Sequence, residues 1–184
     1  MADFSAGQRL LLVRHAMPEV DPATPAERWR LGPDGLAAAR RLAPLVRRPA
    51  YFVASTEPKA FQTLCEVATD TMVVIDAGFA EVRRPHVRSA DDYRAAARAY
   101  VGGERRDGWE PHEEVAARFE AAVVLHLAAA ADRTLVVGTH GLASTVWLAG
   151  RYRLGPSPEE FWAELRFPDL IEVDLATGLT STLL

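Results

Sequence analysis

The sequence predicts a single-domain α/β fold in which a mostly parallel, twisted sheet is covered by helices on both faces. Two observations lead to this prediction. Short apolar runs typical of buried strands alternate along the chain with longer segments in which apolar residues recur at helical spacing. The chain has 184 residues, a length suited to one domain, and no internal repeat or low-complexity linker divides it. We therefore expect residues 1–184 to form one domain.

Three strands and two helices are predicted in the first half of the chain. The strands are short apolar runs between polar segments: residues 9–14, 51–54 and 72–75. A polar loop at 16–31 leads to the first helix, which opens near Pro33 because proline suits the first helical position. The apolar spacing of this helix continues to Val46, and a second helix covers residues 58–69.

The second half of the chain is predicted to be richer in helix. Residues 76–88 form an irregular stretch, and Ser89 caps the helix that follows it, which ends at Gly102-Gly103. The remaining elements are helices at 111–131, 141–150 and 157–165, a strand at 134–138, and a hairpin of residues 170–175 and 179–183.

Composition and charge narrow the classes of function. Hydrophobic residues make up 49% of the chain and charged residues 25%, as in ordinary soluble domains. The formal net charge of −4 gives no reason to expect a nucleic-acid partner, although a local cluster of cations would still suit a small anionic substrate. A single cysteine, Cys65, excludes an internal disulfide. No signal-peptide pattern or bilayer-spanning run is present, so we expect a cytoplasmic protein with no membrane partner.

Chemically active side chains follow four of the predicted strands. Each strand is followed by a segment with a cation, a histidine or a carboxylate: Arg14-His15, residues 55–59, residues 81–86 and residues 139–141. Because ligands bind at the carboxyl ends of the strands in open α/β sheets, we expect these segments to meet at one edge. One such segment is readily explained as a solvated turn, but four at the same edge are not.

These residue types together suit phosphoryl transfer through a covalent histidine. A neutral His15 attacks phosphorus through a ring nitrogen. Arg14, Lys59 and His140 hold the phosphoryl oxygens, where positioning and charge supply most of the catalysis. Glu81 protonates the leaving oxygen and then activates a water molecule. Since side-chain cations supply the charge, we expect neither a metal nor a cofactor.

Five segments resemble motifs of the histidine phosphatase superfamily, also called phosphoglycerate-mutase-like, and they occur in the same order. Residues 11–16 are similar to its Arg-His-Gly signature, and residues 136–141 to its second-histidine motif. Residues 31–36 and 55–63 resemble its Leu-Thr-x-x-Gly and Ser-Ser-x-x-x-Arg-Ala-x-x-Thr segments, and residues 109–111 weakly resemble its Gly-Glu-Ser helix start. Together these segments cover nearly the whole chain.

The resemblance implies a phosphoglycerate-mutase-like fold and a role for each matching residue. His15 corresponds to the phosphorylated nucleophile, and Arg14 and His140 correspond to phosphate ligands. Glu81 fills the position of the general acid, because Gly141 stands where another branch of the superfamily has an acidic residue. Glu57 and Glu110 remain alternatives for the acid: Glu57-Pro58 and Glu110-Pro111 are expected near the same edge.

Two positions depart from the family pattern. Ala16 replaces a glycine, which is acceptable if the backbone there needs no positive φ. Lys59 stands where the family has a second arginine, in a segment one residue shorter, so the charge is kept but the bidentate fork is lost. We predict that Lys59 points into the pocket and contacts the phosphate. Arg84 either lines the pocket mouth, where it would select an anionic substrate, or belongs to a solvated basic loop.

The function expected from the sequence is hydrolysis of a small phosphomonoester through a phosphohistidine. The chain lacks the length of the family's mutases, whose extra segments cover the site and keep water from the phosphoenzyme. Three alternatives stay open: a phosphatase of protein phosphohistidine, a phosphoglycerate-type mutase, and a catalytically weak phosphate-binding protein on the same fold. The expected partner is therefore a small phosphate ester, and a homodimer is one of the oligomeric states left open.

Overall fold

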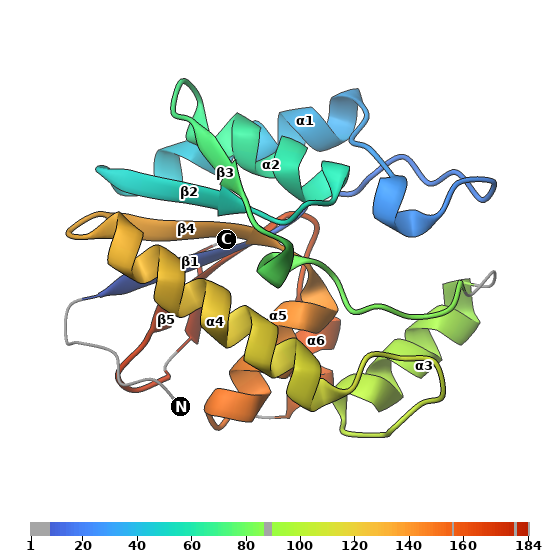
Figure 1. The fold of residues 1–184 in the computed structure, drawn as a ribbon. Coiled ribbons are helices and arrows are strands. Elements are labelled where there is room, and N and C mark those ends of the chain that lie inside the picture. Colours follow the sequence, from blue (N-terminus) through green and yellow to red (C-terminus); the bar gives the residue numbers. More distant parts are fainter. Residues whose placement is uncertain (1–7, 87–89, 156, 179, 184) are drawn as a thin grey trace.

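The computed structural model describes residues 8–86, 90–155, 157–178 and 180–183. Within these residues, six strands form one sheet in the order β3-β2-β4-β1-β5-β6 (Figure 1). The strands are β1 (Arg9–Arg14), β2 (Ala50–Ala54), β3 (Val73–Ile75), β4 (Thr134–Thr139), β5 (Asp169–Asp174) and β6 (Thr180–Thr182). Strands β1 to β4 are parallel, whereas β5 runs antiparallel to both of its neighbours. The predicted mostly parallel sheet is confirmed.

Helices cover both faces of this sheet, as predicted (Figure 1). One face carries α1 (Pro33–Arg40) and α2 (Pro58–Ala68), and the other carries α4 (His112–Ala130), α5 (Gly141–Arg151) and α6 (Pro158–Glu164). Helix α3 (Ala90–Val101) packs on α5 and α6 and lies beyond the carboxyl ends of the parallel strands. The connections contain the short 3-10 turns η1 (Ala26–Arg28), η2 (Ala43–Leu45) and η3 (Ala77–Phe79). None of the helices in the described segments is both long and apolar enough to cross a membrane.

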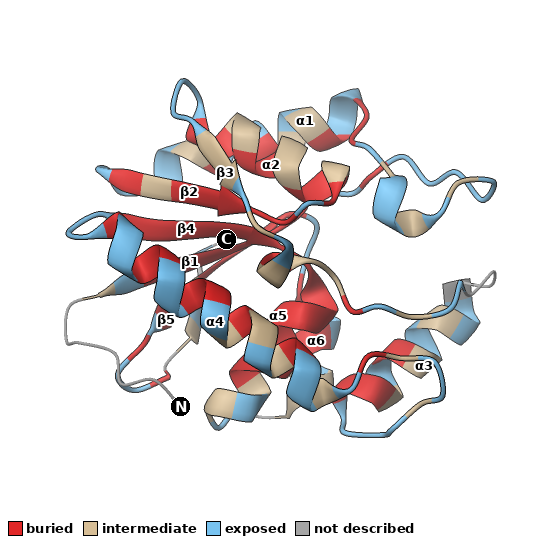
Figure 2. Cartoon of the chain, viewed as in Figure 1, coloured by how far each residue is buried: buried red, intermediate tan, exposed pale blue. Residues whose placement is uncertain are grey.

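Both faces of β1 are buried, which explains why its sequence is apolar without alternation (Figure 2). Leu10 and Leu12 belong to the cluster that packs against α4 and α5, whereas Leu11 and Val13 belong to the cluster on the side of α2. Burying each such side chain stabilises the fold by about 1.5–3 kcal/mol. The two clusters therefore fix β1 at the centre of the domain, and with it the position of the residues that follow the strand.

The first helix is shorter than its apolar spacing predicts. Helix α1 ends at Arg40, and η2 follows it. Pro44 explains the difference, because proline has no N–H to donate to the Arg40 carbonyl and its ring would collide with that carbonyl. Leu42 and Val46 are still buried, but they reach the core from the 3-10 turn. The predicted cap at Ser89 and the first residue of the predicted last strand, Leu179, lie outside the described residues.

Candidate active site

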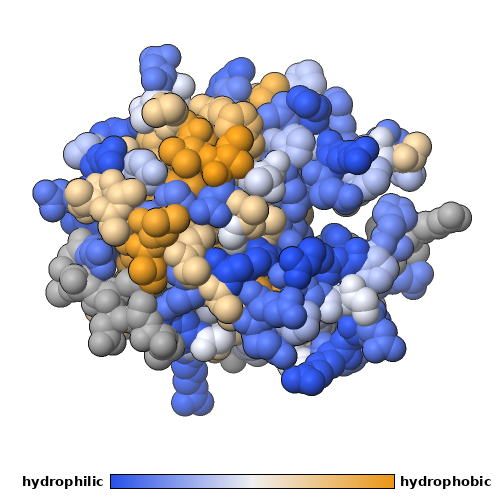
Figure 3. Space-filling view, viewed as in Figure 1, coloured by the Kyte–Doolittle hydropathy of each residue, from blue (hydrophilic) through white to orange (hydrophobic). Residues whose placement is uncertain are grey.

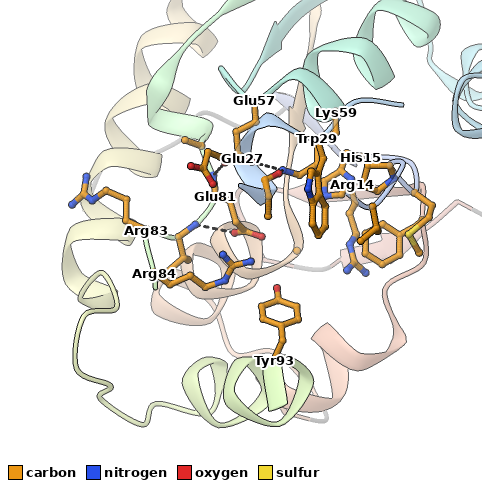
Figure 4. A pocket seen from close by; sticks show the side chains of 18 of the residues that line it. Arg14, His15, Glu27, Trp29, Glu57, Lys59, Glu81, Arg83, Arg84 and Tyr93 are labelled. Carbon is orange, nitrogen blue, oxygen red and sulfur yellow. Dashed lines mark hydrogen bonds and ion pairs between the residues drawn. The ribbon is translucent and has the colours of Figure 1, made fainter. Parts of the chain in front are cut away.

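A pocket of about 470 Å³ opens at the carboxyl edge of the parallel strands. Figure 3 shows it as a hollow, bordered mainly by hydrophilic side chains, between the segment that contains η1 and helix α3. Five of the six residues predicted for the site line it: Arg14, His15, Lys59, Glu81 and Arg84 (Figure 4). The sixth, His140, is fully buried beside them, with its ring centroid 5.1 Å from that of His15. The structure therefore brings all six together.

His15 directly follows β1, and its backbone N–H donates to the Thr139 carbonyl at 3.1 Å. Its Nδ1 lies 2.8 Å from the carbonyl oxygen of Ala16. Because a carbonyl can only accept, Nδ1 carries the proton and Nε2 keeps a free lone pair. Burial, with the nearby His140 and Lys59, holds the pKa of His15 well below its ordinary value. The ring is therefore neutral at pH 7, which is the form that a nucleophile requires.

Ala16, one of the two departures from the family pattern, is accommodated without backbone strain. In the part of the chain that the structure describes, positive φ angles at residues other than glycine occur only at Thr69 and Ala131. The Ala16 N–H donates to Thr63 Oγ1 at 2.9 Å, and the side chain is buried. The condition for an alanine at this position is thus met.

His140 lies between β4 and α5, and none of its surface is exposed. Burial lowers the pKa of His140 to about 3, so its ring is also neutral at pH 7. Its Nε2 lies 2.8 Å from Ser55 Oγ and 3.6 Å from a carboxylate oxygen of Glu57. Its Nδ1 is buried and has no hydrogen-bond partner among the described residues. That nitrogen therefore has hydrogen-bonding capacity that no described residue uses.

Arg14 is the last residue of β1, and the segment between α6 and β5 holds its guanidinium. Nη1 donates to the Leu165 carbonyl, and the guanidinium carbon lies 3.6 Å from the centre of the Phe167 ring. A Cβ at position 141 would come within 3.1 Å of the guanidinium, so Gly141 permits this close approach. Burial lowers the pKa of Arg14 to about 10, which leaves the group charged at pH 7. Its buried Nε has no partner within the described residues and can serve an anion.

Lys59 is buried in the first turn of α2 and is not turned to solvent. Its ammonium forms an ion pair with Glu57 and donates to the Ala26 carbonyl at 2.8 Å. The ammonium also contributes to the low pKa values of His15 and His140, which places its charge close to both rings. Lys59 thus lies at the site, where the sequence predicted it, and Glu57 holds its ammonium there.

Glu81 follows η3 and reaches the amino end of α5. One carboxylate oxygen accepts the N–H of Ala143 at 2.9 Å and that of Val82 at 3.0 Å, and the other lies 3.4 Å from the N–H of Leu142. The partial positive charge of a helix amino end favours a carboxylate there. Arg118 fixes the backbone of this segment through bonds to the carbonyls of Gly78, Ala80 and Glu81.

The two other carboxylates considered as the acid differ in their surroundings. Glu110 does not line the pocket but accepts hydrogen bonds from Arg118 and from the Arg83 N–H. Burial raises the pKa of Glu110, but these bonds outweigh it and lower the pKa below the usual value. Glu57 lines the pocket, forms an ion pair with Lys59 and accepts the Glu81 N–H at 2.9 Å. Of the three, Glu81 is the carboxylate in the pocket that is not paired with a cation.

Several residues of the pocket were missed by reasoning from the sequence. Tyr93 on α3, Trp29 after η1 and Phe167 before β5 all line it. Tyr93 contacts Arg84, and Phe167 contacts Arg14, across distant parts of the chain. An isolated aromatic residue in a loop or helix carries no signal of such a role. Ser55 lay within a recognised segment, but its bond to His140 could not be read from the sequence.

Comparisons with known proteins concern the family and the fold of the chain. The sequence model of the histidine phosphatase superfamily (branch 1) matches residues 10–169. No curated protein matches the chain. Mycobacterial glucosyl-3-phosphoglycerate phosphatase has a similar structure, with a TM-score of 0.71 and 19% identity over 96% of this chain and 97% of that one. Phosphoserine phosphatase from Entamoeba histolytica is also similar, with a TM-score of 0.69 and 14% identity over 96% of this chain and 95% of that one. YhfR from Bacillus stearothermophilus has a TM-score of 0.71 and 19% identity over 96% of each chain.

Proposed function

This chain belongs to the histidine phosphatase superfamily (branch 1) and is a phosphatase, and we propose that it hydrolyses a small phosphomonoester through a covalent phosphohistidine at His15. The observation that carries the proposal is the 2.8 Å contact between His15 Nδ1 and the Ala16 carbonyl. This contact leaves Nε2 as the nucleophilic atom of a neutral ring that lines the pocket.

In the first step, His15 Nε2 forms a bond to phosphorus while the bond between phosphorus and the ester oxygen breaks. Glu81 gives its proton to the departing oxygen, and an alcohol leaves. Arg14, Lys59 and His140 donate to the phosphoryl oxygens, whose charge grows in the transition state. In the second step, Glu81 takes a proton from water, the water oxygen attacks phosphorus, and the bond to Nε2 breaks. Orthophosphate leaves, and both residues return to their starting states.

The substrate class follows from the size and lining of the pocket. A volume of about 470 Å³ lies within the range of roughly 300–1,000 Å³ typical of small-molecule sites. Apolar side chains line part of the wall, among them Val20, Trp29 and Phe167, so the pocket offers contacts beyond the phosphate. The names of two structural relatives, a glucosyl-3-phosphoglycerate phosphatase and a phosphoserine phosphatase, support a small phosphorylated metabolite as substrate.

The proposal is tested by trapping the intermediate. Wild-type protein is mixed with an aryl phosphate, quenched at alkaline pH within milliseconds, and digested for mass spectrometry. We expect a phosphoryl group on the peptide that contains His15, and no turnover in His15→Ala. His112→Ala, at a histidine that does not line the pocket, should keep normal turnover. Turnover by His15→Ala at the wild-type rate would overturn the mechanism.

A panel of phosphorylated metabolites then identifies the reaction that the site favours. Release of orthophosphate from one of them supports a hydrolase. Transfer between the two hydroxyls of phosphoglycerate, without release, would support a mutase instead. Binding of orthophosphate with no turnover of any compound would point to a phosphate-binding protein.

A further inference from the structure

Arg83 and Arg84 are adjacent in sequence but lie in different surroundings (Figure 4). The Arg83 side chain is largely exposed, points away from the pocket and pairs with Glu110 and Glu114 at 3.3 and 3.0 Å. The Arg84 side chain turns into the pocket instead. Among the described residues, no carboxylate forms an ion pair with it, and its Nε is buried without a partner. A guanidinium without an ion pair keeps N–H donors that a ligand can use, although the carboxylates of Glu81 and Glu57 act on its charge from across the pocket.

Aromatic side chains hold Arg84 in this orientation. The guanidinium carbon lies 4.7 Å from the ring centre of Tyr93 and 5.8 Å from that of Trp109. Arg84 also shares a hydrogen bond with the Tyr93 hydroxyl. Burial raises the pKa of Tyr93, so this hydroxyl keeps its proton at pH 7 and is a further donor. The aromatic contacts hold the planar group, and the bond with Tyr93 uses one of its N–H donors, so the other donors remain for a ligand.

The Tyr93 hydroxyl and the guanidinium groups of Arg84 and Arg14 point into the same space (Figure 4). Both arginines act electrostatically on Tyr93, so both charges are close to its hydroxyl. Arg14 belongs to the group beside His15, whereas Arg84 and Tyr93 come from the loop after η3 and from α3. One pocket therefore holds two separate groups of anion donors, one at the nucleophile and one at the opposite wall.

We propose that Arg84 and Tyr93 bind a carboxylate on the substrate, so that the enzyme acts on phosphomonoesters of hydroxy acids or hydroxy amino acids. This inference rests on the proposed phosphatase function and adds a second anchoring point to it. A guanidinium fork matches the two oxygens of a carboxylate, and a phenol hydroxyl adds a third hydrogen bond. A monoanion fits this wall better than a second phosphate would, since Glu57 and Glu81 line the same pocket.

The test uses two pairs of compounds that differ by one carboxylate. They are O-phosphoserine with O-phosphoethanolamine, and 3-phosphoglycerate with glycerol 3-phosphate. Their dissociation constants are measured by calorimetry on the His15→Ala protein, with and without Arg84→Gln, and orthophosphate is the third ligand. Arg83→Gln is the matched control, because Arg83 is the neighbouring arginine that points away. Binding to a variant without the nucleophile is independent of turnover, so failure of the phosphatase mechanism leaves this test intact.

We expect the carboxylate-bearing member of at least one pair to bind about 10- to 100-fold more tightly, which is the effect of charge-assisted hydrogen bonds. Arg84→Gln should remove this preference and leave orthophosphate affinity within about threefold. Tyr93→Phe should reduce the preference in part, and Arg83→Gln should keep it.

Three results would overturn the inference. The first is equal affinity for both members in both pairs. The second is a preference that persists in Arg84→Gln. The third is a loss of orthophosphate affinity in Arg84→Gln as large as the loss for the carboxylates, which would make Arg84 a ligand of the phosphate itself. Retained orthophosphate affinity also shows that the variant is folded.

Discussion

Ser55 Oγ lies 2.8 Å from Nε2 of His140 and at the same time accepts the backbone N–H of Glu57 at 3.1 Å. The hydroxyl accepts one proton from Glu57, and we expect it to donate its own proton to Nε2. The ring proton of the neutral His140 is then placed on Nδ1, the nitrogen without a partner among the described residues. In this tautomer His140 presents a donor, and not a lone pair, to an anion. We therefore expect Ser55 to act through His140 as a positioning residue.

Ser55→Ala should lower kcat/KM by roughly 10- to 100-fold, because the tautomer of His140 is no longer fixed. Ser55→Thr, which keeps the hydroxyl, should recover much of the loss. Nitrogen-15 NMR of the imidazole reads out the tautomer directly and is insensitive to a merely structural effect. A wild-type spectrum with the proton on Nε2 of His140 would contradict this assignment.

Lys59→Ala should reduce kcat/KM by roughly 10- to 1000-fold, comparable with the loss of one donor to the transition-state oxyanion. Lys59→Arg should retain part of the activity, limited by the different reach of its fork. Steady-state kinetics on an aryl phosphate measures both. If Lys59→Ala keeps wild-type kcat/KM and orthophosphate inhibition, the buried ammonium only neutralises Glu57.

Glu81→Gln should impair substrates according to their leaving groups. An alkyl phosphate needs a proton on its departing oxygen, so its turnover should fall by roughly 100- to 10,000-fold. An aryl phosphate with an acidic phenol leaves without this help and should be affected far less in the first step. Glu57→Gln is the comparison. If Glu57→Gln shows the dependence on the leaving group and Glu81→Gln does not, Glu57 is the acid.

The two buried histidines of the candidate site, His15 and His140, make stability sensitive to acid. His140 has a pKa of about 3 in the folded protein and about 6.5 when unfolded, so between these values the unfolded chain binds a proton that the folded chain does not. Stability from this group is therefore present above pH 6.5 and lost as pH falls towards 3. His140→Gln should lose less unfolding free energy than wild type between pH 7.5 and 5, by about 2 kcal/mol. Urea titrations at both pH values measure this difference. The exposed His86, changed to Gln, should leave the wild-type dependence intact.

Chelation should leave turnover unchanged. Arg14, Lys59 and His140 would stabilise the charge on the phosphoryl oxygens, which is the role that a metal ion would otherwise have. Activity is measured after dialysis against EDTA and again after addition of Mg²⁺, Mn²⁺ or Zn²⁺. A loss in chelator that one of these ions reverses would show that a metal takes part.

The sequence was informative wherever local pattern decides structure. The apolar run between Arg9 and Arg14 predicted β1 with its observed bounds, because the central residues of a strand buried on both faces are apolar. The order of strands and helices predicted a parallel sheet, and this placed His15 and His140 at one edge. Recognition of Lys59 also needed no coordinates, since its spacing to Thr63 matches the arginine of the family segment.

The rest of the site depends on contacts between distant residues. Arg14 and Phe167 are in contact because β5 pairs with β1. No local pattern in either segment predicts that contact. The orientations of Arg83 and Arg84 differ although both are arginines in one loop, because Glu114 on α4 attracts the first and Tyr93 on α3 the second. Similarly, apolar spacing alone extended the first helix to Val46, whereas Pro44 ends it earlier.

Arg14 and the carbonyl that holds it, Leu165, are 151 residues apart in sequence. During translation, β1 leaves the ribosome long before the segment that carries Leu165 and Phe167 has been made. The neighbours of β1 in the sheet are β4 and β5, and both come from the second half of the chain. A nascent chain therefore has His15 but not the fixed arginine beside it. We expect no turnover during synthesis, and activity only when nearly the whole chain has folded.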